Sequence, residues 1–184
     1  MVWVGTMCDV IATLSLADPS ISTPNLVQRA FCPSIHSSRA IMWTIQPTMI
    51  AGTIMVATAA ALRLWCFRTL GQLFTFEVTI RPKHELITDG PYAYVRHPSY
   101  TGVFLTLLGA TAVLCSPGTW LMECGILSRG GVVMLGFWII KCAIAFKGTI
   151  LRLRTEDEAL RKTFGSRWDD YARRVPYSLI PGMI

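Results

Sequence analysis

Charged residues are scarce in this chain of 184 residues. Asp, Glu, Lys and Arg make up 15% of it, whereas 52% of the residues are hydrophobic. Soluble domains carry about 25% charged residues, and here the apolar residues also gather in long blocks. The composition therefore argues against a soluble domain with a large core and favours an integral membrane protein.

The signatures of several common sites are also missing. The six cysteines are scattered and form no C-x-x-C pair: Cys8, Cys32, Cys66, Cys115, Cys124 and Cys142. We therefore predict neither a disulfide framework nor a metal site. The chain has no H-E-x-x-H, G-x-G-x-x-G or phosphate loop, which disfavours hydrolase and nucleotide-driven functions. The basic residues flank apolar runs without a recognition motif, so no nucleic-acid partner is expected.

Four apolar runs approach the length of about 20 residues that a membrane-crossing helix needs. The first, residues 1–17, lacks the basic start of a signal peptide and is either a short span or an interfacial segment. The other three are residues 41–64, with an alanine-rich face at 57–61 suited to close helix contact, 102–122 and 131–149. The sequence predicts an all-α, multi-pass membrane bundle with about four spans.

The basic residues indicate the orientation of this bundle. Net charge is +6, and 13 of the 17 Lys and Arg lie in residues 63–101 and 147–184. Two spans separate these segments, so both fall on the same side of the membrane, which the positive-inside rule assigns to the cytosol. Residues 84–102 and the C-terminal tail can therefore meet.

Residues 84–102 form a polar stretch between two apolar runs, with two His and three Tyr. Asp89-Gly90-Pro91 predicts a turn, and Pro98 suits the first residue of a helix. A helix that starts there offers free N–H groups to an anionic ligand. We expect the active site here. The alternative is that the histidines are structural and the tyrosines form an interfacial aromatic belt.

The tail is predicted to be helical, because apolar residues recur at helical spacing: Ile150, Leu153, Leu160 and Phe164. Gly165 is a natural helix stop. Ser166-x-x-Asp169 resembles a capping box that opens a second helix. An apolar stripe continues through it: Trp168, Tyr171 and Val175.

Arg152 and Glu156 are neighbours on one helix face if the last span continues past the membrane. They then form either an interfacial salt bridge worth under about 1 kcal/mol or part of a site. Alternatively, Thr155-x-x-Glu158 caps a new helix and changes this geometry.

Two groups of motifs carry a resemblance to a known family. In the loop, His84-Glu-Leu-Ile87, Gly90-Pro-Tyr92 and Arg96-His-Pro-Ser-Tyr-Thr-Gly102 resemble the cofactor loop of the isoprenylcysteine carboxyl methyltransferase family. In the tail, the resemblance to the family's C-terminal signature rests on Glu156-Asp-Glu-Ala-Leu160, Phe164-Gly165, Tyr171 and Val175-Pro176 with Ile180-Pro181. Similar loops occur in phospholipid N-methyltransferases and, more loosely, in membrane sterol reductases.

The resemblance implies an N-terminal membrane part (1–67) and a methyltransferase region (68–184). The latter comprises a cofactor loop (77–102), a membrane hairpin (102–149) and a helical tail (150–184). The cofactor would be S-adenosylmethionine, and the resemblance places these residues around it: Glu77, His84, Glu85, Leu86, Ile87, Tyr92, His97, Pro98, Ser99, Tyr100 and Glu156. Arg152 would face the substrate carboxylate. Asp157 replaces the second Glu of the family's acidic pair and is assigned no role.

The activity implied is methyl transfer to the C-terminal carboxylate of a prenylated cysteine. It would occur at the cytosolic face of the endoplasmic reticulum membrane, with prenylated proteins and membrane lipids as partners. An ionised carboxylate needs no general base, so catalysis would come from positioning and exclusion of water, without a catalytic residue. The alternatives are another lipophilic acceptor (a phospholipid amine or a small acid), a nicotinamide-dependent reductase, and a non-catalytic membrane protein. A cation at Arg152 favours an acidic acceptor over an amine.

Overall fold

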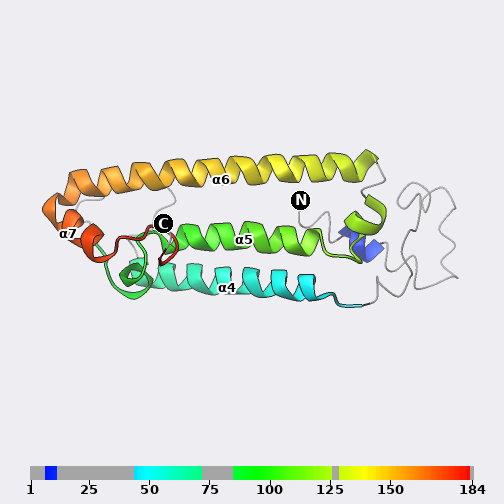
Figure 1. Cartoon of the computed structure of the whole chain (residues 1–184), viewed down its shortest axis with the longest axis horizontal. Helices are drawn as coiled ribbons and strands as arrows, with labels where there is room; N and C mark the ends of the chain where they lie inside the picture. The colour runs from blue at the N-terminus through cyan, green and yellow to red at the C-terminus, as the bar shows by residue number, and fades with distance from the viewer. Residues whose placement is uncertain (1–6, 12–43, 72–84, 126–128, 183–184) are drawn as a thin grey trace, which may run out of the picture. The chain divides into compact units, whose positions relative to one another are not determined.

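The computed structural model describes residues 7–11, 44–71, 85–125 and 129–182, and it contains no strand in these ranges. The elements in chain order are α4 (Pro47–Leu70), the 3₁₀ turn η2 (Gly90–Ala93), α5 (Pro98–Leu114), the π-helical turn η3 (Leu121–Gly125), α6 (Arg129–Phe164) and α7 (Ser166–Arg174) (Figure 1). Residues 7–11 are helical, and the rest of the predicted first span lies outside the described residues. The predicted all-α class is confirmed for the described ranges.

The helix α4 starts at Pro47, later than the predicted start at residue 41, and continues to Leu70, beyond the predicted end at residue 64. It continues because no glycine or proline interrupts residues 64–70. Gly71 follows with φ of +52°, a left-handed conformation that ends an α-helix.

The helix α5 starts at Pro98, as predicted, because proline fits the first helical position without loss of a hydrogen bond. It ends at Leu114, short of the predicted end at residue 122, because Ser116-Pro117-Gly118 interrupts the helix. Gly118 takes φ of +87°, a left-handed conformation that favours glycine.

The helix α6 has 36 residues and continues well past the predicted span 131–149. Thr155 does not cap a new helix, because its hydroxyl donates to the Leu151 carbonyl at 2.9 Å within the same helix. The alternative in which Thr155 and Glu158 cap a new helix is therefore excluded. Arg152 and Glu156 lie one turn apart on a continuous helix.

The junction between α6 and α7 differs from the prediction. Gly165, with φ of +55°, is the N-cap residue, and Ser166 is already the first residue of α7. The predicted capping box is wrong. Gly165 takes the left-handed conformation and occupies the N-cap position, so Ser166 is already inside the helix and cannot cap it. Asp169 instead pairs with Arg161, with 3.0 Å between Oδ1 and Nε.

Two of the helices, α4 and α6, are long and apolar enough to cross a membrane, judged by length and composition. The helix α5 is also apolar but shorter, with 17 residues. A helix of 36 residues is about 54 Å long, against roughly 30 Å of hydrocarbon in a bilayer. The polar last turns of α6 would then lie outside the membrane. The total of about four spans stays a prediction.

The chain divides into two compact units, each of which takes parts of α4, α5 and α6. Unit 1 comprises Met1–Met55 and Leu107–Ala143. In it, α4 approaches α5 closely at Gly52, where a Cβ atom would lie 2.7 Å from the Gly109 carbonyl oxygen and 2.8 Å from Val113 Cγ2. Only glycine allows this backbone contact.

Other contacts in unit 1 are polar or buried. The Thr48 and Ser116 hydroxyls lie 2.7 Å apart, and Trp138 Nε1 donates to Thr111 Oγ1 at 3.1 Å. Cys124 is 1% exposed and is disulfide-bonded, a bond that the scattered cysteines did not predict.

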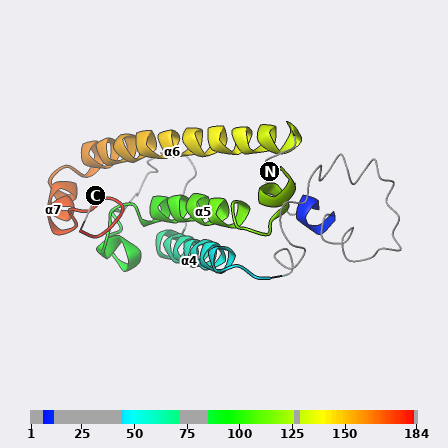
Figure 2. The ribbon, with the colours of Figure 1, turned by 45° about the vertical axis from the view of Figure 1, so that its right-hand side comes forward.

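Unit 2 comprises Val56–Thr106 and Ile144–Ile184. Here α4 and α5 lie side by side (Figures 1 and 2), and a Cβ atom at Gly102 would lie 2.7 Å from Arg63 Cγ. Ala59 of the predicted small-residue face is fully buried. The rings of Phe104 in α5 and Phe146 in α6 lie 4.8 Å apart. All described site residues belong to this unit.

Candidate active site

The loop before α5 is shaped by the predicted turn at Asp89-Gly90-Pro91. Gly90 takes φ of +60°, and a Cβ atom there would lie 3.0 Å from Thr69 Oγ1. The turn leads into η2, which places Tyr92 in the interior, 9% exposed. Burial, and then the neighbouring Cys66 thiol, raise the pKa of Tyr92 far above its usual range.

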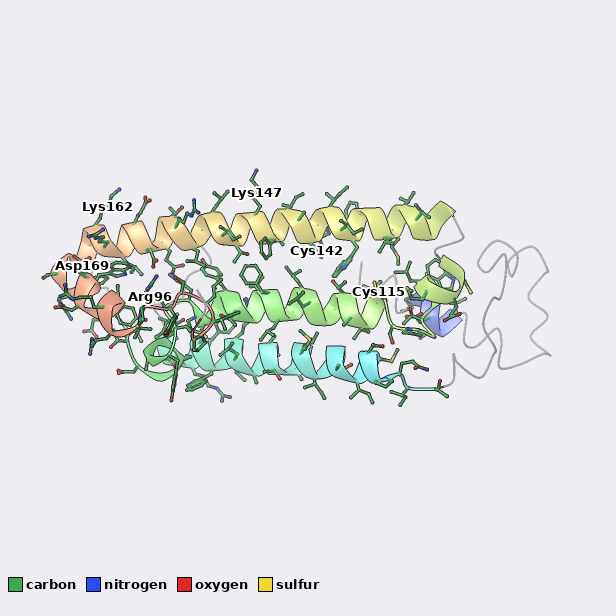
Figure 3. All side chains as sticks on the ribbon, in the orientation of Figure 1. Arg96, Cys115, Cys142, Lys147, Lys162 and Asp169 are labelled. Carbon is green, nitrogen blue, oxygen red and sulfur yellow. The ribbon has the colours of Figure 1, made fainter. Side chains whose placement is uncertain are left out.

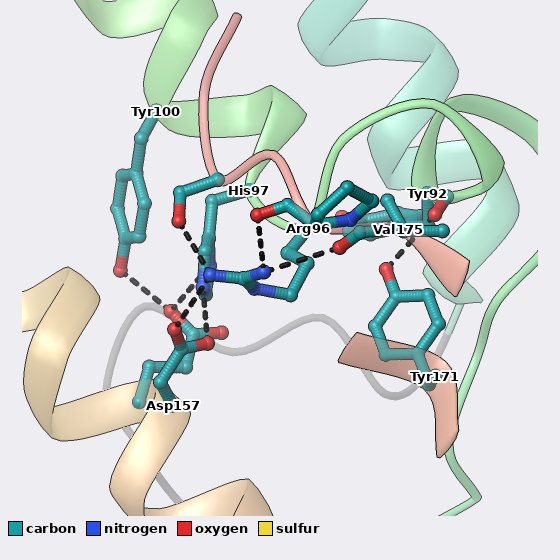
Figure 4. A network of polar contacts seen from close by, with 10 residues as sticks. Tyr92, Arg96, His97, Tyr100, Asp157, Tyr171 and Val175 are labelled. Atoms are coloured by element: carbon teal, nitrogen blue, oxygen red, sulfur yellow. Dashed lines mark hydrogen bonds and ion pairs between the residues drawn. The ribbon is translucent and has the colours of Figure 1, made fainter. Parts of the chain in front are cut away.

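Arg96 lies at the centre of a polar network that joins the loop, α6 and the tail (Figure 4). Its Nη2 lies 3.4 Å from Asp157 Oδ2 and donates to Ser178 Oγ at 2.6 Å. Its Nη1 donates to the carbonyls of Val175 at 3.1 Å and Pro176 at 2.8 Å. A guanidinium suits this task because its donors form a rigid planar fork.

The tail also pairs with the loop through the backbone. The Arg96 N–H donates to the Tyr177 carbonyl at 3.0 Å, and the His97 N–H donates to the Ser178 carbonyl at 2.8 Å. The Thr101 hydroxyl donates to the Leu179 carbonyl at 2.7 Å. The tail therefore lies along the start of α5, as Figure 2 shows.

His97 is 4% exposed and lies between two carboxylates of α6. Its Nε2 is 2.7 Å from Asp157 Oδ1, and its Nδ1 is 3.7 Å from Glu156 Oε2. An ionised carboxylate only accepts hydrogen bonds, so Nε2 carries the proton in the shorter contact. Asp157 thus fixes the orientation of the His97 ring.

Tyr100 holds the second carboxylate. Its hydroxyl donates to Glu156 Oε2 at 2.9 Å, and its ring stacks on His97 with 5.7 Å between centroids. Burial, and then Glu156, raise the pKa of Tyr100, while Arg152 opposes this rise. Tyr100 therefore remains a donor to Glu156, with the Arg152 charge close by.

The buried side of α7 supports the loop. Trp168, Tyr171 and Val175 are 9%, 3% and 7% exposed, which confirms the predicted stripe. The Tyr171 hydroxyl donates to the Tyr92 carbonyl at 2.9 Å, and burial raises the pKa of Tyr171 to about 12 although the Arg96 charge opposes it. The Arg96 guanidinium lies 5.9 Å from the centre of the Trp168 ring.

The helix α6 presents different residues to the site and to its surroundings. Lys147 and Lys162 project from the side turned away from Arg96 (Figure 3). Glu158 is exposed and, at 100° per residue, lies about 200° around the helix from Glu156. The site is therefore confined to one face of α6.

The structure brings three of the predicted cofactor residues into direct contact: His97, Tyr100 and Glu156. Tyr92 is buried in η2, and Arg152 lies one turn before Glu156 on α6. Contact of these residues with a cofactor or substrate stays a prediction.

The other predicted residues lie in three places. Pro98 and Ser99 form the first turn of α5. One exposed and two half-buried side chains lead into the Gly90 turn: Glu85, Leu86 and Ile87. Two residues lie outside the described part of the chain: Glu77 and His84.

The start of α5 offers fewer free N–H groups than expected. Both the Tyr100 and the Thr101 N–H donate to the His97 carbonyl, at 3.1 and 3.4 Å. Pro98 has no N–H. An anion at this helix start would therefore depend on the Ser99 N–H, because the His97 carbonyl closes the first turn.

The predicted site residues did not include Arg96 and Asp157, which the structure places at the centre of the network. The signal for Asp157 was its place directly after Glu156, and for Arg96 its place directly before His97. Nothing in the sequence indicated Ser178, because its contact with Arg96 joins residues 82 positions apart.

Comparison with known proteins agrees with the resemblance predicted from the motifs. Residues 51–129 match the model of the isoprenylcysteine carboxyl methyltransferase (ICMT) family. Protein-S-isoprenylcysteine O-methyltransferase B of Arabidopsis thaliana is 30% identical over 127 residues, covering 68% of this chain and 55% of that protein. Protein-S-isoprenylcysteine O-methyltransferase of Rattus norvegicus is 35% identical over 133 residues, covering 70% of this chain and 40% of that protein.

A third relative carries a different name. The nickel-cobalt-cadmium resistance protein NccN of Alcaligenes xylosoxydans xylosoxydans is 28% identical over 141 residues, covering 77% of this chain and 54% of that protein. The chain thus spans about half the length of the curated relatives it matches. The predicted resemblance is confirmed: in sequence, this chain is a relative of the isoprenylcysteine carboxyl methyltransferase family.

Proposed function

We propose that this protein transfers a methyl group from S-adenosylmethionine to the C-terminal carboxylate of a prenylated cysteine. One observation carries the proposal: His97 and Tyr100 of the loop converge on Glu156 of α6. The motifs that resemble the family's loop and tail are thus adjacent in space. The region 68–184 would contain the whole cofactor site.

The acidic side chains fit a cationic cofactor. Glu156 and Asp157 place two carboxylates on one turn of α6, and the Glu156 side chain is 35% exposed. Glu156 would hold the ammonium group of the cofactor, and the Ser99 N–H would face its carboxylate. His84, Glu85, Leu86 and Ile87, with Glu77 further upstream, would form the rest of the lining.

The chemistry needs positioning rather than a proton shuttle. S-adenosylmethionine, when bound, supplies an electrophilic methyl group on a sulfonium. The acceptor carboxylate is already ionised, so the protein needs no general base and must instead align the reactants and exclude water. Arg152, one turn from Glu156, would hold the acceptor carboxylate through paired hydrogen bonds.

The orientation of the protein follows from its charges. We place the site and the tail in the cytosol, because most of the Lys and Arg lie in the two segments that contain them, residues 63–101 and 147–184. The resemblance to the family favours the endoplasmic reticulum membrane. A prenyl chain could then reach the site from the bilayer.

The activity test uses the whole chain in detergent, with labelled S-adenosylmethionine and N-acetyl-S-farnesylcysteine. We expect saturable cofactor binding and a labelled methyl ester. The methyl ester of the acceptor is the control, because it has no free carboxylate and should gain no label. A phospholipid amine tests the rival acceptor. Absence of cofactor binding would overturn the proposal, and binding followed by transfer only to the amine would replace the acceptor.

Two substitutions separate the cofactor from the acceptor. We expect Glu156→Ala to raise KM for S-adenosylmethionine about tenfold or more, and Arg152→Ala to raise KM for the farnesylcysteine by a similar factor, as lost charged hydrogen bonds do. Glu158→Ala and Arg154→Ala are matched controls, because each lies two residues after its test residue, about 200° around α6 and away from the site. Equal small effects of all four would favour a purely structural role for Arg152 and Glu156.

A further inference from the structure

We propose that Asp157 is a positioning residue for the cofactor site. It acts through Arg96 and His97, and it keeps the tail on the loop. This inference rests on the proposed function, since S-adenosylmethionine is the ligand that the site would hold.

Asp157 uses both of its carboxylate oxygens on the loop. Oδ1 lies 2.7 Å from His97 Nε2, and Oδ2 lies 3.4 Å from Arg96 Nη2. The three side chains are 21%, 4% and 14% exposed. Such partly buried pairs are less screened by water and salt than surface pairs. Asp157 is therefore held by two neighbouring loop residues at once.

Through Arg96, this contact reaches the tail. The same guanidinium that faces Asp157 donates to Ser178 Oγ and to the carbonyls of Val175 and Pro176. The backbone of the tail accepts from the Arg96 and His97 N–H groups beside it. Figure 4 draws the side-chain contacts of Arg96 as dashed lines. A carboxylate that orients the guanidinium therefore also supports the docking of the tail.

Through His97, the same carboxylate acts on the site. Asp157 holds Nε2 of the ring, while Glu156, the proposed cofactor ligand, faces Nδ1 at 3.7 Å. Tyr100 stacks on that ring and donates to Glu156. A rotated His97 ring would therefore disturb both partners of Glu156, although Asp157 touches no reacting atom.

Asparagine cannot replace Asp157 in this arrangement. Its amide has one acceptor oxygen, which must face Arg96 because a guanidinium only donates, so its NH₂ group would face His97 Nε2 and force the ring proton onto Nδ1. Glutamate restores both acceptors and the charge on a longer side chain. A role in positioning thus predicts a large effect of Asp157→Asn and a partial recovery in Asp157→Glu.

The test measures kinetics and hydrogen exchange on the whole chain in detergent. For Asp157→Asn we expect KM for S-adenosylmethionine to rise about tenfold, with kcat and KM for the farnesylcysteine changed less than threefold. Amide exchange at Arg96 and His97, measured without cofactor, should become at least tenfold faster. Asp157→Glu should return both the KM for S-adenosylmethionine and the exchange rates most of the way to the wild-type values. Asp170→Asn is the control, because Asp170 is an exposed acid paired with Arg173 on α7.

The outcomes separate this inference from the proposed function. Faster exchange together with a higher KM for the cofactor supports the positioning role. Faster exchange with an unchanged KM, or a loss of kcat alone as expected from partial unfolding, overturns it, and so does no change in either. A wild-type chain that binds no S-adenosylmethionine overturns the proposed function, and this inference with it.

Discussion

Tyr171 is a polar group that the fold buries almost completely. It is 3% exposed, and its hydroxyl donates to the Tyr92 carbonyl at 2.9 Å. Burial raises its pKa to about 12 from an ordinary 10.0. Below pH 10 the folded and unfolded states are both protonated at this group. Between pH 10 and 12 only the unfolded state loses the proton, so stability falls as pH rises.

We therefore expect Tyr171→Phe to lower stability at pH 8 and to reduce the further loss of stability at high pH. At pH 8 it should lower stability by about 1 kcal/mol, because the buried Tyr92 carbonyl loses its donor. Between pH 10 and 12 the variant should lose less further stability than the wild type. Thermal unfolding in detergent at several pH values measures both effects.

Tyr177→Phe serves as the control for this prediction, because Tyr177 is 38% exposed. Its unfolding curves should follow those of the wild type. A Tyr171→Phe curve that runs parallel to the wild type from pH 8 to 12 would contradict the raised pKa.

At the scale of elements, one residue sets how closely α4 and α5 approach in unit 1. A Cβ atom at Gly52 would lie 2.7 Å from the Gly109 carbonyl oxygen, which is backbone and cannot rotate away. Gly136 in α6 is different, because nothing lies within 4 Å of the position of its Cβ atom. Glycine is thus required at one helical position and dispensable at the other.

Gly52→Ala should therefore destabilise the protein by about 1 to 3 kcal/mol, the usual range for an overpacked contact. The matched change Gly136→Ala should leave stability unchanged or raise it, because alanine is the better helix former. Denaturation of both variants in the same detergent decides between them. Equal stability of the two would show that α4 and α5 do not pack at Gly52.

At the scale of the whole molecule, charge and hydrophobicity predict on which side of the membrane the tail lies. The long helices α4 and α6 are membrane-crossing candidates, and the basic residues concentrate in 63–101 and 147–184. Several exposed arginines lie in α7, Arg173 with 76% of its side chain accessible. These are cleavage sites for trypsin on whichever side of the membrane the tail lies.

Trypsin added to sealed, cytosol-out membrane vesicles should therefore release peptides from residues 162–184. Mass spectrometry of the released peptides measures this. A protein enclosed in the vesicles should stay intact as the control for sealing. Release of the tail only after detergent is added would place the site on the opposite side.

Much of the architecture could be predicted because it depends on local chemistry. Pro98 opens α5, Gly118 and Gly165 take left-handed conformations, and Trp168 and Tyr171 share the buried stripe of α7. The capping box at Ser166 failed because Gly165 gave a tighter turn, which depends on how α6 ends. Local sequence rules allowed either Gly165 or Ser166 to be the N-cap residue of α7, and they do not decide between the two.

The sequence by itself determined the all-helical class, the apolar candidate spans, the basic tail and the resemblance carried by His97, Tyr100 and Glu156. These depend on composition and on residues close together in the chain. Only the tertiary structure decided that Arg96 and Asp157 meet, 61 positions apart, and that the tail pairs with the loop. The physical reason is that a guanidinium finds its acceptors in space, and no periodicity along the chain records which carboxylate will face it.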